Sequence, residues 1–274
     1  MMRHSVRQSG YTLLEMAIVL AIMGAIAGSV LTLGSAKHEA SKIDIIKKRL
    51  DAIEEAIKRH SYTAGFIPCP ADPTTLPGDA TYGISQDCGG TIPAGIDSAG
   101  VASDEVWIGA IPTRSLNLPD SAMYDGWQNR FTYVAVADLA INSSGFSSYT
   151  TSSTTGVIQI VDNDGTQVTD AIADTVVAYA IISHGKDKKG AITRNGTMPI
   201  MCGATTKDDE NCNADSVFRD SRILNSTVAA NYYDDLIRWK VRHFMQPPAG
   251  DANLYNSSCI TESLGGGADI VNHQ

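Results

Sequence analysis

The sequence predicts an α+β protein in which one long N-terminal helix packs on an antiparallel β-sheet. No proline occurs before Pro68, and the chain up to that point reads as one helix, first apolar and then amphipathic. After residue 64, short β-rich runs alternate with clusters of glycine, proline, serine and threonine. The roughly 200 residues that follow the helix are enough to bury one core as a single domain.

The chain begins with a short basic segment followed by a long apolar run. Residues 1–10 carry Arg3 and Arg7 and no acid, and positive charge before an apolar span keeps that end in the cytoplasm. Residues 16–33 contain no charge, and at 1.5 Å per residue they would span about 27 Å, close to the thickness of the hydrocarbon layer. We therefore expect residues 11–36 to form a transmembrane helix.

Glu15 is the one charged residue in this apolar segment. A carboxylate in hydrocarbon costs roughly 2.5–3.5 kcal/mol even on insertion scales, so its presence calls for a role. Three interpretations compete: a secretory signal with Ala25 to Ala27 as its cleavage site, a plain membrane anchor, and a leader removed before the helix. Only the third uses Glu15, together with the small Gly10 at the cut and the aromatic Tyr11 as the new N-terminus.

The run from Gly10 to Glu15 resembles the cleavage and methylation motif of type IV pilins and of the pseudopilins of type II secretion. The resemblance implies that a prepilin peptidase cuts after Gly10 and methylates the amino group of Tyr11. It also implies that Glu15 pairs with the terminal amine of a neighbouring subunit and sets the register between helices. Such a pair is favourable only when both charges are buried together. The simpler interpretation, in which Glu15 only reaches towards the lipid headgroups, stays open.

Two features of the family are altered in this helix. Tyr11 stands where phenylalanine is commoner. Major pilins usually have a proline near the middle of the helix, and this chain has none there, with Thr32 at about the corresponding place. The second difference favours a minor component over the bulk subunit.

The helix is expected to continue as an amphipathic segment over residues 37–63. One apolar stripe with spacings of three and four residues runs along it, on an otherwise charged surface. Its members are Ile43, Ile46, Leu50, Ile53 and Ile57. We expect this stripe to pack against the sheet of a globular head that comprises residues 64–274.

Six segments of the head read as strands: 106–111, 130–138, 156–162, 175–183, 190–194 and 236–244. Residues 142–155 read as an exposed loop. Segments 124–133, 182–187 and 233–239 resemble parts of the pseudopilin sheet, and Trp127 and Trp239 within them are expected in the core. The insert at 64–105 has no counterpart in that resemblance.

The five cysteines point to disulfide bonds. Beyond the membrane the head would lie in an oxidising compartment, where disulfides persist. Local spacing favours the pairs Cys69–Cys88 and Cys202–Cys212, while other pairings stay open. Cys259 is left over, either free or paired with a partner.

The sequence predicts no cofactor, with Ca²⁺ as the one ion left open. No C-x-x-C and no histidine pair at zinc spacing occurs. Asp187, Asp234 and Asp235 lie in the segments where some pseudopilins bind calcium, and carboxylate oxygens suit that ion. The alternative is that these are solvated turn acids, one of them capping a turn or pairing with Arg238.

Charge and motifs argue against two other classes of function. The net charge of −9 disfavours broad nucleic-acid binding, which needs clustered Lys and Arg. A local patch (Lys186, Lys188, Lys189 and Arg194) leaves DNA capture open, although a solvated turn explains it more simply. Ser183 and His184 are adjacent but would point to opposite faces of a strand. Hydrolase, metalloprotease and phosphate-loop motifs do not occur, so no enzyme is predicted.

The resemblance implies a filament subunit, a minor pilin or pseudopilin of a type II secretion or type IV pilus assembly. Its single helix would hold it in the bacterial inner membrane with a periplasmic head, before it enters a pilus or pseudopilus. The prepilin peptidase and other pilins would be its partners. Two alternatives stay open: a pilus-tip adhesin or DNA-uptake component that binds its ligand at 64–105 or 142–155, and a secreted enzyme with an ordinary signal peptide.

Overall fold

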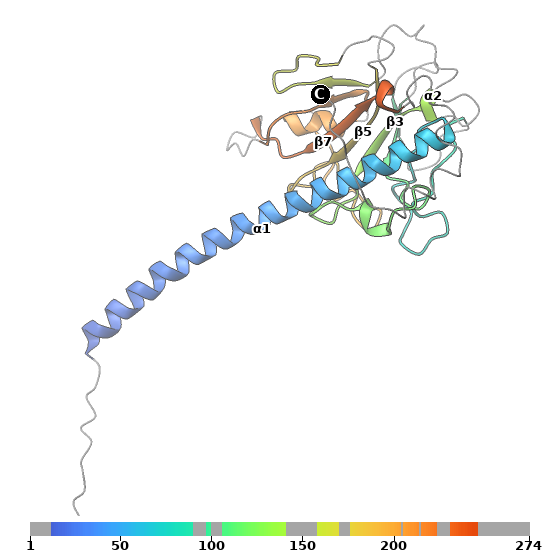
Figure 1. Cartoon of the computed structure of the whole chain (residues 1–274). Helices are drawn as coiled ribbons and strands as arrows, with labels where there is room; N and C mark the ends of the chain where they lie inside the picture. The colour runs from blue at the N-terminus through green and yellow to red at the C-terminus, as the bar shows by residue number, and fades with distance from the viewer. Residues whose placement is uncertain are drawn as a thin grey trace, which may run out of the picture. The chain divides into compact units, whose positions relative to one another are not determined.

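The computed structural model describes residues 12–89, 97–99, 106–140, 158–169, 176–203, 205–213, 215–223 and 231–245 (Figure 1). The chain divides into two compact units, Met1–Asp44 and Ile45–Gln274. Helix α1, Leu13–Ala64, begins in the first unit and contributes its last turns to the second. The expected loop 142–155 and Cys259 lie outside the described residues.

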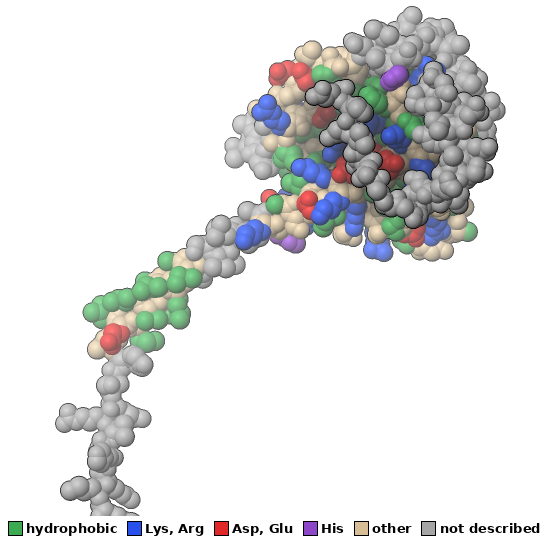
Figure 2. Space-filling view, viewed as in Figure 1, with side chains coloured by type: hydrophobic (Ala, Val, Ile, Leu, Met, Phe, Trp, Pro, Cys, Tyr) green, Lys and Arg blue, Asp and Glu red, His purple; other side chains and the backbone are tan. Residues whose placement is uncertain are grey.

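Large apolar side chains cover the first turns of α1 and are open to solvent (Figure 2). Their exposed fractions range from 44% to 89% for Leu13, Leu14, Met16, Ile18, Val19, Leu20, Ile22, Met23 and Ile26. Over the part of the chain that the structure describes, no helix combines the length and the apolarity that a membrane crossing requires.

Gly65 sets the end of α1. Its φ of +80° lies in the left-handed region, which glycine adopts without a steric penalty and which commonly follows the last helical residue. Its N–H donates to the carbonyl of Ser61 at 2.9 Å, so one of the last free carbonyls of the helix is satisfied.

The head is built on a five-stranded antiparallel sheet. In spatial order its strands are β1 (Asp97–Ala99), β2 (Val106–Ala110), β3 (Thr132–Val136), β5 (Val177–Ser183) and β7 (Leu236–Val241). Tyr133 faces Ile181 across β3 and β5, and Ala180 faces Trp239 across β5 and β7. A separate parallel pair consists of β4 (Gln159–Val161) and β6 (Val217–Arg219). The predicted antiparallel sheet is confirmed.

The apolar stripe of α1 forms one side of the core. Ile46, Leu50, Ile53 and Ile57 are at most 1% exposed and belong to the same buried cluster as the residues of β3 and β5. Figure 1 shows this part of α1 lying across the sheet. Full burial of each such side chain contributes roughly 1.5–3 kcal/mol. All seven residues of β5 are buried, as expected for an interior strand whose two faces are both covered.

The two tryptophans expected in the core lie at its margin. Trp127 and Trp239 are partly buried and pack against the main cluster, whereas Trp107 on β2 is completely buried. A side chain as large as tryptophan is seldom fully buried, which makes Trp107 the more unusual of the three.

The expected strand at 190–194 is wrong, because this segment is a loop. Gly190 has a φ of +74°, which turns the chain away from a strand conformation. The carbonyls of Thr193 and Arg194 each accept a hydrogen bond from the buried Arg130 side chain at 3.1 Å. Among the described residues, backbone pairing of this segment is limited to one antiparallel bridge between Thr193 and Asn129, beside which the Arg130 N–H donates to the Ile192 carbonyl at 2.8 Å.

Other strand boundaries differ because short helices follow the strands. The expected strands 130–138 and 236–244 end early, at Val136 and Val241. The helices α2 (Ala137–Ala140) and η4 (Arg242–Met245) directly follow β3 and β7, whereas η1 (Asp120–Met123) and η2 (Lys207–Asn211) lie in loops. Strands β1 and β6 were not expected, because three residues are too few to show a periodic pattern.

Two disulfide bonds tie loops of the head. Cys69 joins Cys88 with Cα atoms 5.9 Å apart, and Cys202 joins Cys212 with Cα atoms 5.6 Å apart. These are the two pairs that the local spacing favours. Cross-links of this kind typically stabilise a fold by about 2–4 kcal/mol, because they restrict the unfolded chain.

Candidate functional site

Glu15 closes the first turn of α1 together with Thr12. Thr12 Oγ1 accepts a hydrogen bond from the Glu15 N–H at 3.3 Å, and Glu15 Oε2 accepts bonds from the Thr12 N–H at 2.8 Å and from Thr12 Oγ1 at 3.0 Å. This reciprocal arrangement is a capping box. Sequence reasoning missed this local role, although Thr-x-x-Glu at a helix start is its known signature. The expected cleavage pair, Gly10 and Tyr11, lies outside the described residues.

Three carboxyl groups from three segments meet in the head. Asp187 follows β5, Asp208 lies in η2, and Asp234 precedes β7; one oxygen of each lies within 4.8 Å of the others. Asp208 Oδ1 accepts the Asp234 N–H at 3.2 Å. Asp234 Oδ2 accepts the N–H groups of Lys186 and Asp187 at 2.6 and 3.1 Å. Backbone contacts therefore hold the cluster together.

Two of the three carboxyl groups are buried and have unused acceptors, while Asp187 is half-buried. Asp208 and Asp234 are 1% and 4% exposed, and Asp208 Oδ2 and Asp234 Oδ1 have no hydrogen-bond partner among the described residues. Burial, followed by repulsion from Asp187 and Asp234, raises the pKa of Asp208 to about 7. Burial also raises the pKa of Asp187. Hard oxygen ligands that repel each other in a buried place fit a hard divalent cation such as Ca²⁺.

Asp235 is not part of this cluster, contrary to the expectation from sequence. Its Oδ2 accepts a hydrogen bond from Asn211 Nδ2 at 2.9 Å, and burial, followed by repulsion from Asp208, raises its pKa far above the usual range. Arg238 pairs with Asp51 at 3.8 Å. Asp208 takes the place expected for Asp235, because the loop containing η2 folds back onto the end of β5. No local pattern around Asp187 indicates that contact.

Ser183 and His184 bind different partners. Ser183 Oγ donates to the buried carboxylate of Asp125 at 2.9 Å, and His184 Nε2 pairs with Thr132 Oγ1 at 2.8 Å. Burial lowers the pKa of His184 to about 4, so the ring is neutral near pH 7. These two neighbours therefore do not act together as a nucleophile and its base.

The basic patch after β5 is partly used within the head. Lys189 Nζ lies 2.7 Å from Asp209 Oδ1. The Arg194 guanidinium lies over the ring of Tyr124, 5.2 Å from its centroid. These two cations hold loops of the head in place, a role that neither the DNA-capture nor the solvated-turn interpretation includes.

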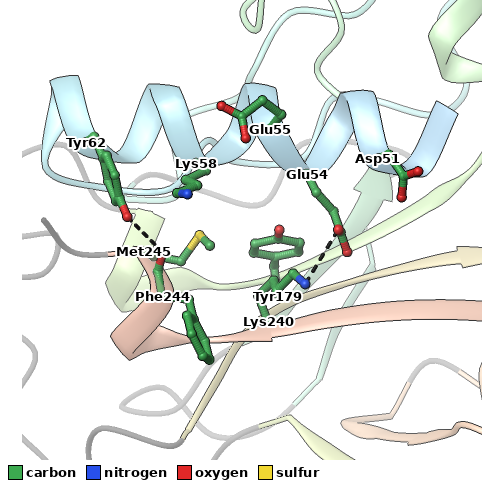
Figure 3. Close-up of a pocket in the computed structure, with 9 residues that line it drawn as sticks. All are labelled: Asp51, Glu54, Glu55, Lys58, Tyr62, Tyr179, Lys240, Phe244 and Met245. Atoms are coloured by element: carbon green, nitrogen blue, oxygen red, sulfur yellow. Dashed lines mark hydrogen bonds and ion pairs between the residues drawn. The ribbon is translucent and has the colours of Figure 1, made fainter. Parts of the chain in front are cut away.

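A cavity of about 340 Å³ lies between α1 and the end of the sheet (Figure 3). Glu54 Oε2 faces Lys240 Nζ at 3.5 Å, and Tyr62 Oη donates to the Phe244 carbonyl at 3.4 Å. Tyr179 is fully buried, and its hydroxyl has no partner among the described residues. Burial raises the pKa of Tyr179 far above its usual range. Acids, amines and aromatic rings are mixed in the walls, so the lining selects no single class of ligand.

Comparison with known proteins identifies the N-terminal segment. Residues 6–31 match the family described as the prokaryotic N-terminal methylation motif, and this span contains Gly10, Tyr11 and Glu15. No curated protein and no solved structure matches the chain. The motif is the hallmark of one class, the type IV pilins and pseudopilins. The chain carries that hallmark in its first helix.

Several general properties follow from the motif. It implies processing by a prepilin peptidase and assembly with other pilin subunits. It indicates a chain that is first anchored in a membrane and then associated with a pilus. It also indicates a structural subunit rather than an enzyme.

Proposed function

We propose that the chain is a minor pilin or pseudopilin of a type II secretion or type IV pilus assembly. The match of residues 6–31 to the methylation motif carries the proposal. In this scheme residues 11–36 anchor the chain in the bacterial inner membrane with the head in the periplasm. The chain is then processed after Gly10 and drawn into a pilus or pseudopilus.

The N-terminal residues have separate roles in this proposal. The peptidase cuts after Gly10 and methylates the amine of Tyr11, and the Glu15 carboxylate pairs with that amine on a neighbouring subunit. The exposed apolar side chains between Leu13 and Ile26 support helix-to-helix assembly, because a subunit interface would keep them out of water once the helix has left the membrane.

Processing is the direct test of this function. When the chain is produced with an active prepilin peptidase, we expect a mature protein that starts at N-methylated Tyr11. Intact mass measurement and N-terminal peptide analysis of the membrane fraction check this start. A Gly10→Val variant is the control, because the bulkier residue at the cut should leave the leader attached. A wild-type chain that starts at Gly28, or that keeps its first ten residues, contradicts the proposal.

We also propose that the head binds Ca²⁺ through Asp187, Asp208 and Asp234. The unused oxygens of Asp208 and Asp234 and the closeness of the three carboxylates support it. A bound ion would remove their mutual repulsion and join the three segments that carry them. Asp235 would not bind the ion but would support the site by accepting the hydrogen bond from Asn211 in η2.

Replacing Asp208 by asparagine is expected to remove the stabilisation by calcium. For the wild type, calcium at one hundred times its Kd stabilises the folded state by about 2.7 kcal/mol, which corresponds to a Tm increase of about 5–10 °C for a head of this size. Asp208→Asn should show little increase at the same calcium concentration. Its calcium-free form should be at least as stable as the wild type, because one of the clustered charges is gone. Thermal unfolding with calcium or a chelator measures both effects.

The matched control is Asp164→Asn, which changes an exposed acid in the turn after β4. This variant should keep the full calcium-induced shift. Equal shifts in Asp208→Asn and the wild type would mean that the cluster does not bind the ion.

A further inference from the structure

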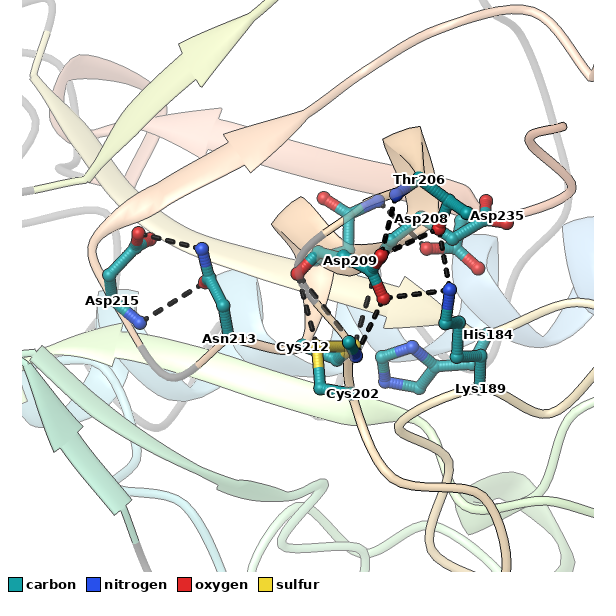
Figure 4. The surroundings of a disulfide bond; sticks show 12 residues. His184, Lys189, Cys202, Thr206, Asp208, Asp209, Cys212, Asn213, Asp215 and Asp235 are labelled. Atoms are coloured by element: carbon teal, nitrogen blue, oxygen red, sulfur yellow. Dashed lines mark hydrogen bonds and ion pairs between the residues drawn. A yellow bond between two sulfur atoms is a disulfide. The ribbon is translucent and has the colours of Figure 1, made fainter. Parts of the chain in front are cut away.

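The Cys202–Cys212 disulfide encloses the short helix that supplies Asp208 (Figure 4). Helix η2 spans Lys207–Asn211, so the bridge begins before the helix and ends at the residue directly after it. A single 3₁₀ turn is too short to be stable by itself, because nucleating a helix is unfavourable. The position of Asp208 therefore depends on what holds this loop closed.

Asp209 fixes the same loop from within. Its carboxylate accepts hydrogen bonds from the N–H groups of Gly203, Thr205 and Thr206 at 2.6–2.8 Å and pairs with Lys189. Although burial opposes it, the bonds from Lys189 and Thr206 hold the pKa of Asp209 well below its usual range. The Asp209 carboxylate therefore binds groups of its own loop and Lys189. The neighbouring Asp208 is the carboxylate that faces the cluster.

The bridge also packs on the segment that carries Asp187. Gly190 has a φ of +74°, and a Cβ at this position would lie 2.2 Å from Cys212 Cβ and 2.8 Å from its sulfur. The backbone at Gly190 is therefore in direct contact with the disulfide. One residue earlier, the Lys189 N–H donates to Asp187 Oδ1 at 2.9 Å. The disulfide of the loop that supplies Asp208 therefore packs directly on the segment that supplies Asp187.

The third carboxylate is tied to the same helix. The Asp234 N–H donates to Asp208 Oδ1, and Asn211, the last residue of η2, donates to Asp235 Oδ2 and to Tyr233 Oη. A shift of η2 would therefore move the segment before β7 as well. All three segments of the cluster meet at the loop that the bridge closes.

We infer that the Cys202–Cys212 disulfide is a positioning element of the metal site, so that calcium affinity depends on this bridge and not on Cys69–Cys88. The inference rests on the calcium site proposed above. Cys69 and Cys88 belong to a different part of the head, which supplies none of the three carboxylates. Their bridge is therefore the matched comparison for a general effect of losing a disulfide.

Terbium luminescence gives a readout at the site itself. Tb³⁺ is a calcium substitute whose emission is sensitised by a nearby tyrosine, and Tyr232 Oη donates to Asp234 Oδ2 at 2.9 Å. Titration of the full chain in detergent with Tb³⁺, followed by competition with Ca²⁺, yields the calcium Kd. If part of the protein is unfolded, the amplitude of this signal falls. If the protein is folded but its carboxylates are displaced, the Kd of the folded fraction rises.

We expect the double variant Cys202→Ser/Cys212→Ser to bind calcium about 10- to 100-fold more weakly, the range typical for losing a group that orients a ligand. Cys69→Ser/Cys88→Ser should keep a Kd close to the wild type, even if its Tm falls. An unchanged Kd in the first variant overturns the inference and leaves the calcium site standing. A wild type that binds neither ion overturns the calcium proposal and the inference with it, without touching the filament proposal.

A second variant keeps the inference testable if the first does not fold. Asp209→Asn weakens the anchor of the loop while both cysteines and all three cluster carboxylates stay in place. It should also raise the calcium Kd, whereas Asp215→Asn, four residues beyond η2 and bonded to Asn213, should not. Equal Kd values in these two variants contradict the inference.

Discussion

Replacing Glu15 by glutamine is expected to prevent the chain from entering filaments while its helix start stays intact. Glutamine can hold the capping box with Thr12, so the substitution removes the charge and little else. If Glu15 pairs with the Tyr11 amine of a neighbour, the amine is left buried and unpaired, at a cost of about 3–5 kcal/mol. That cost lowers incorporation by more than about a hundredfold. Co-expression with wild-type partner subunits and comparison of sheared filaments with the membrane fraction measures the effect.

Thr12→Val provides the complementary control. It removes the capping hydroxyl and keeps the carboxylate, at a cost of about 1 kcal/mol to the helix start. Incorporation should therefore stay near the wild-type level. Glu15→Val loses both functions, and we expect it to insert into the membrane but assemble poorly. If Glu15→Gln assembles normally and Thr12→Val does not, Glu15 acts as a cap and the pairing argument is wrong.

The helix and its packing could be predicted because their signals are local. The stripe from Ile46 to Ile57 repeats over three turns, and a pattern of that length specifies which face is buried. The pairing of the cysteines could be predicted for the same reason, because each disulfide closes a short loop. The Thr12–Glu15 box is equally local, and the spacing Thr-x-x-Glu at the start of a helix is its signature.

The candidate metal site was only half predictable, because its third carboxylate comes from elsewhere in the chain. Asp187 and Asp234 lie in recognisable segments, whereas Asp208 reaches them through a loop whose path the bridge and Asp209 determine. A readable signal was present at Thr206, since Thr-x-x-Asp can cap a helix start, and the structure shows that capping box. This capping signal would have located η2 but not the segments with Asp187 and Asp234 that contact it.

Arg130 illustrates what sequence patterns cannot supply. An arginine is expected at the surface, yet this one is 1% exposed. Its guanidinium donates to the carbonyls of Thr75, Thr193 and Arg194, and so joins two loops that are far apart in the sequence. Two of these contacts reach the loop at 190–194, where the sequence predicts a strand. Because they depend on the completed fold, no local pattern contains them.

Replacing Ile53 by alanine is expected to destabilise the head by about 2–5 kcal/mol, the usual cost of removing a large aliphatic side chain from a close-packed core. Ile53 is 0% exposed and lies in the stripe of α1 that packs on the sheet. For a domain of about 200 residues the loss corresponds to a decrease in Tm of roughly 5–15 °C. Unfolding of the full chain in detergent, followed through tryptophan fluorescence, reports on the head, because all three tryptophans (Trp107, Trp127 and Trp239) lie there.

Ile45→Ala separates packing from helix propensity. Both variants make the same chemical change on the same helix, and alanine is slightly the better helix former at each position. Ile45 is 38% exposed, so its truncation should cost under about 1 kcal/mol. If α1 is held in the head by its apolar stripe, only the Ile53 variant unfolds early. Similar losses in the two variants would mean that the head is stabilised by the helix as a whole, and the stripe would lose its role in anchoring the head to the filament-forming helix.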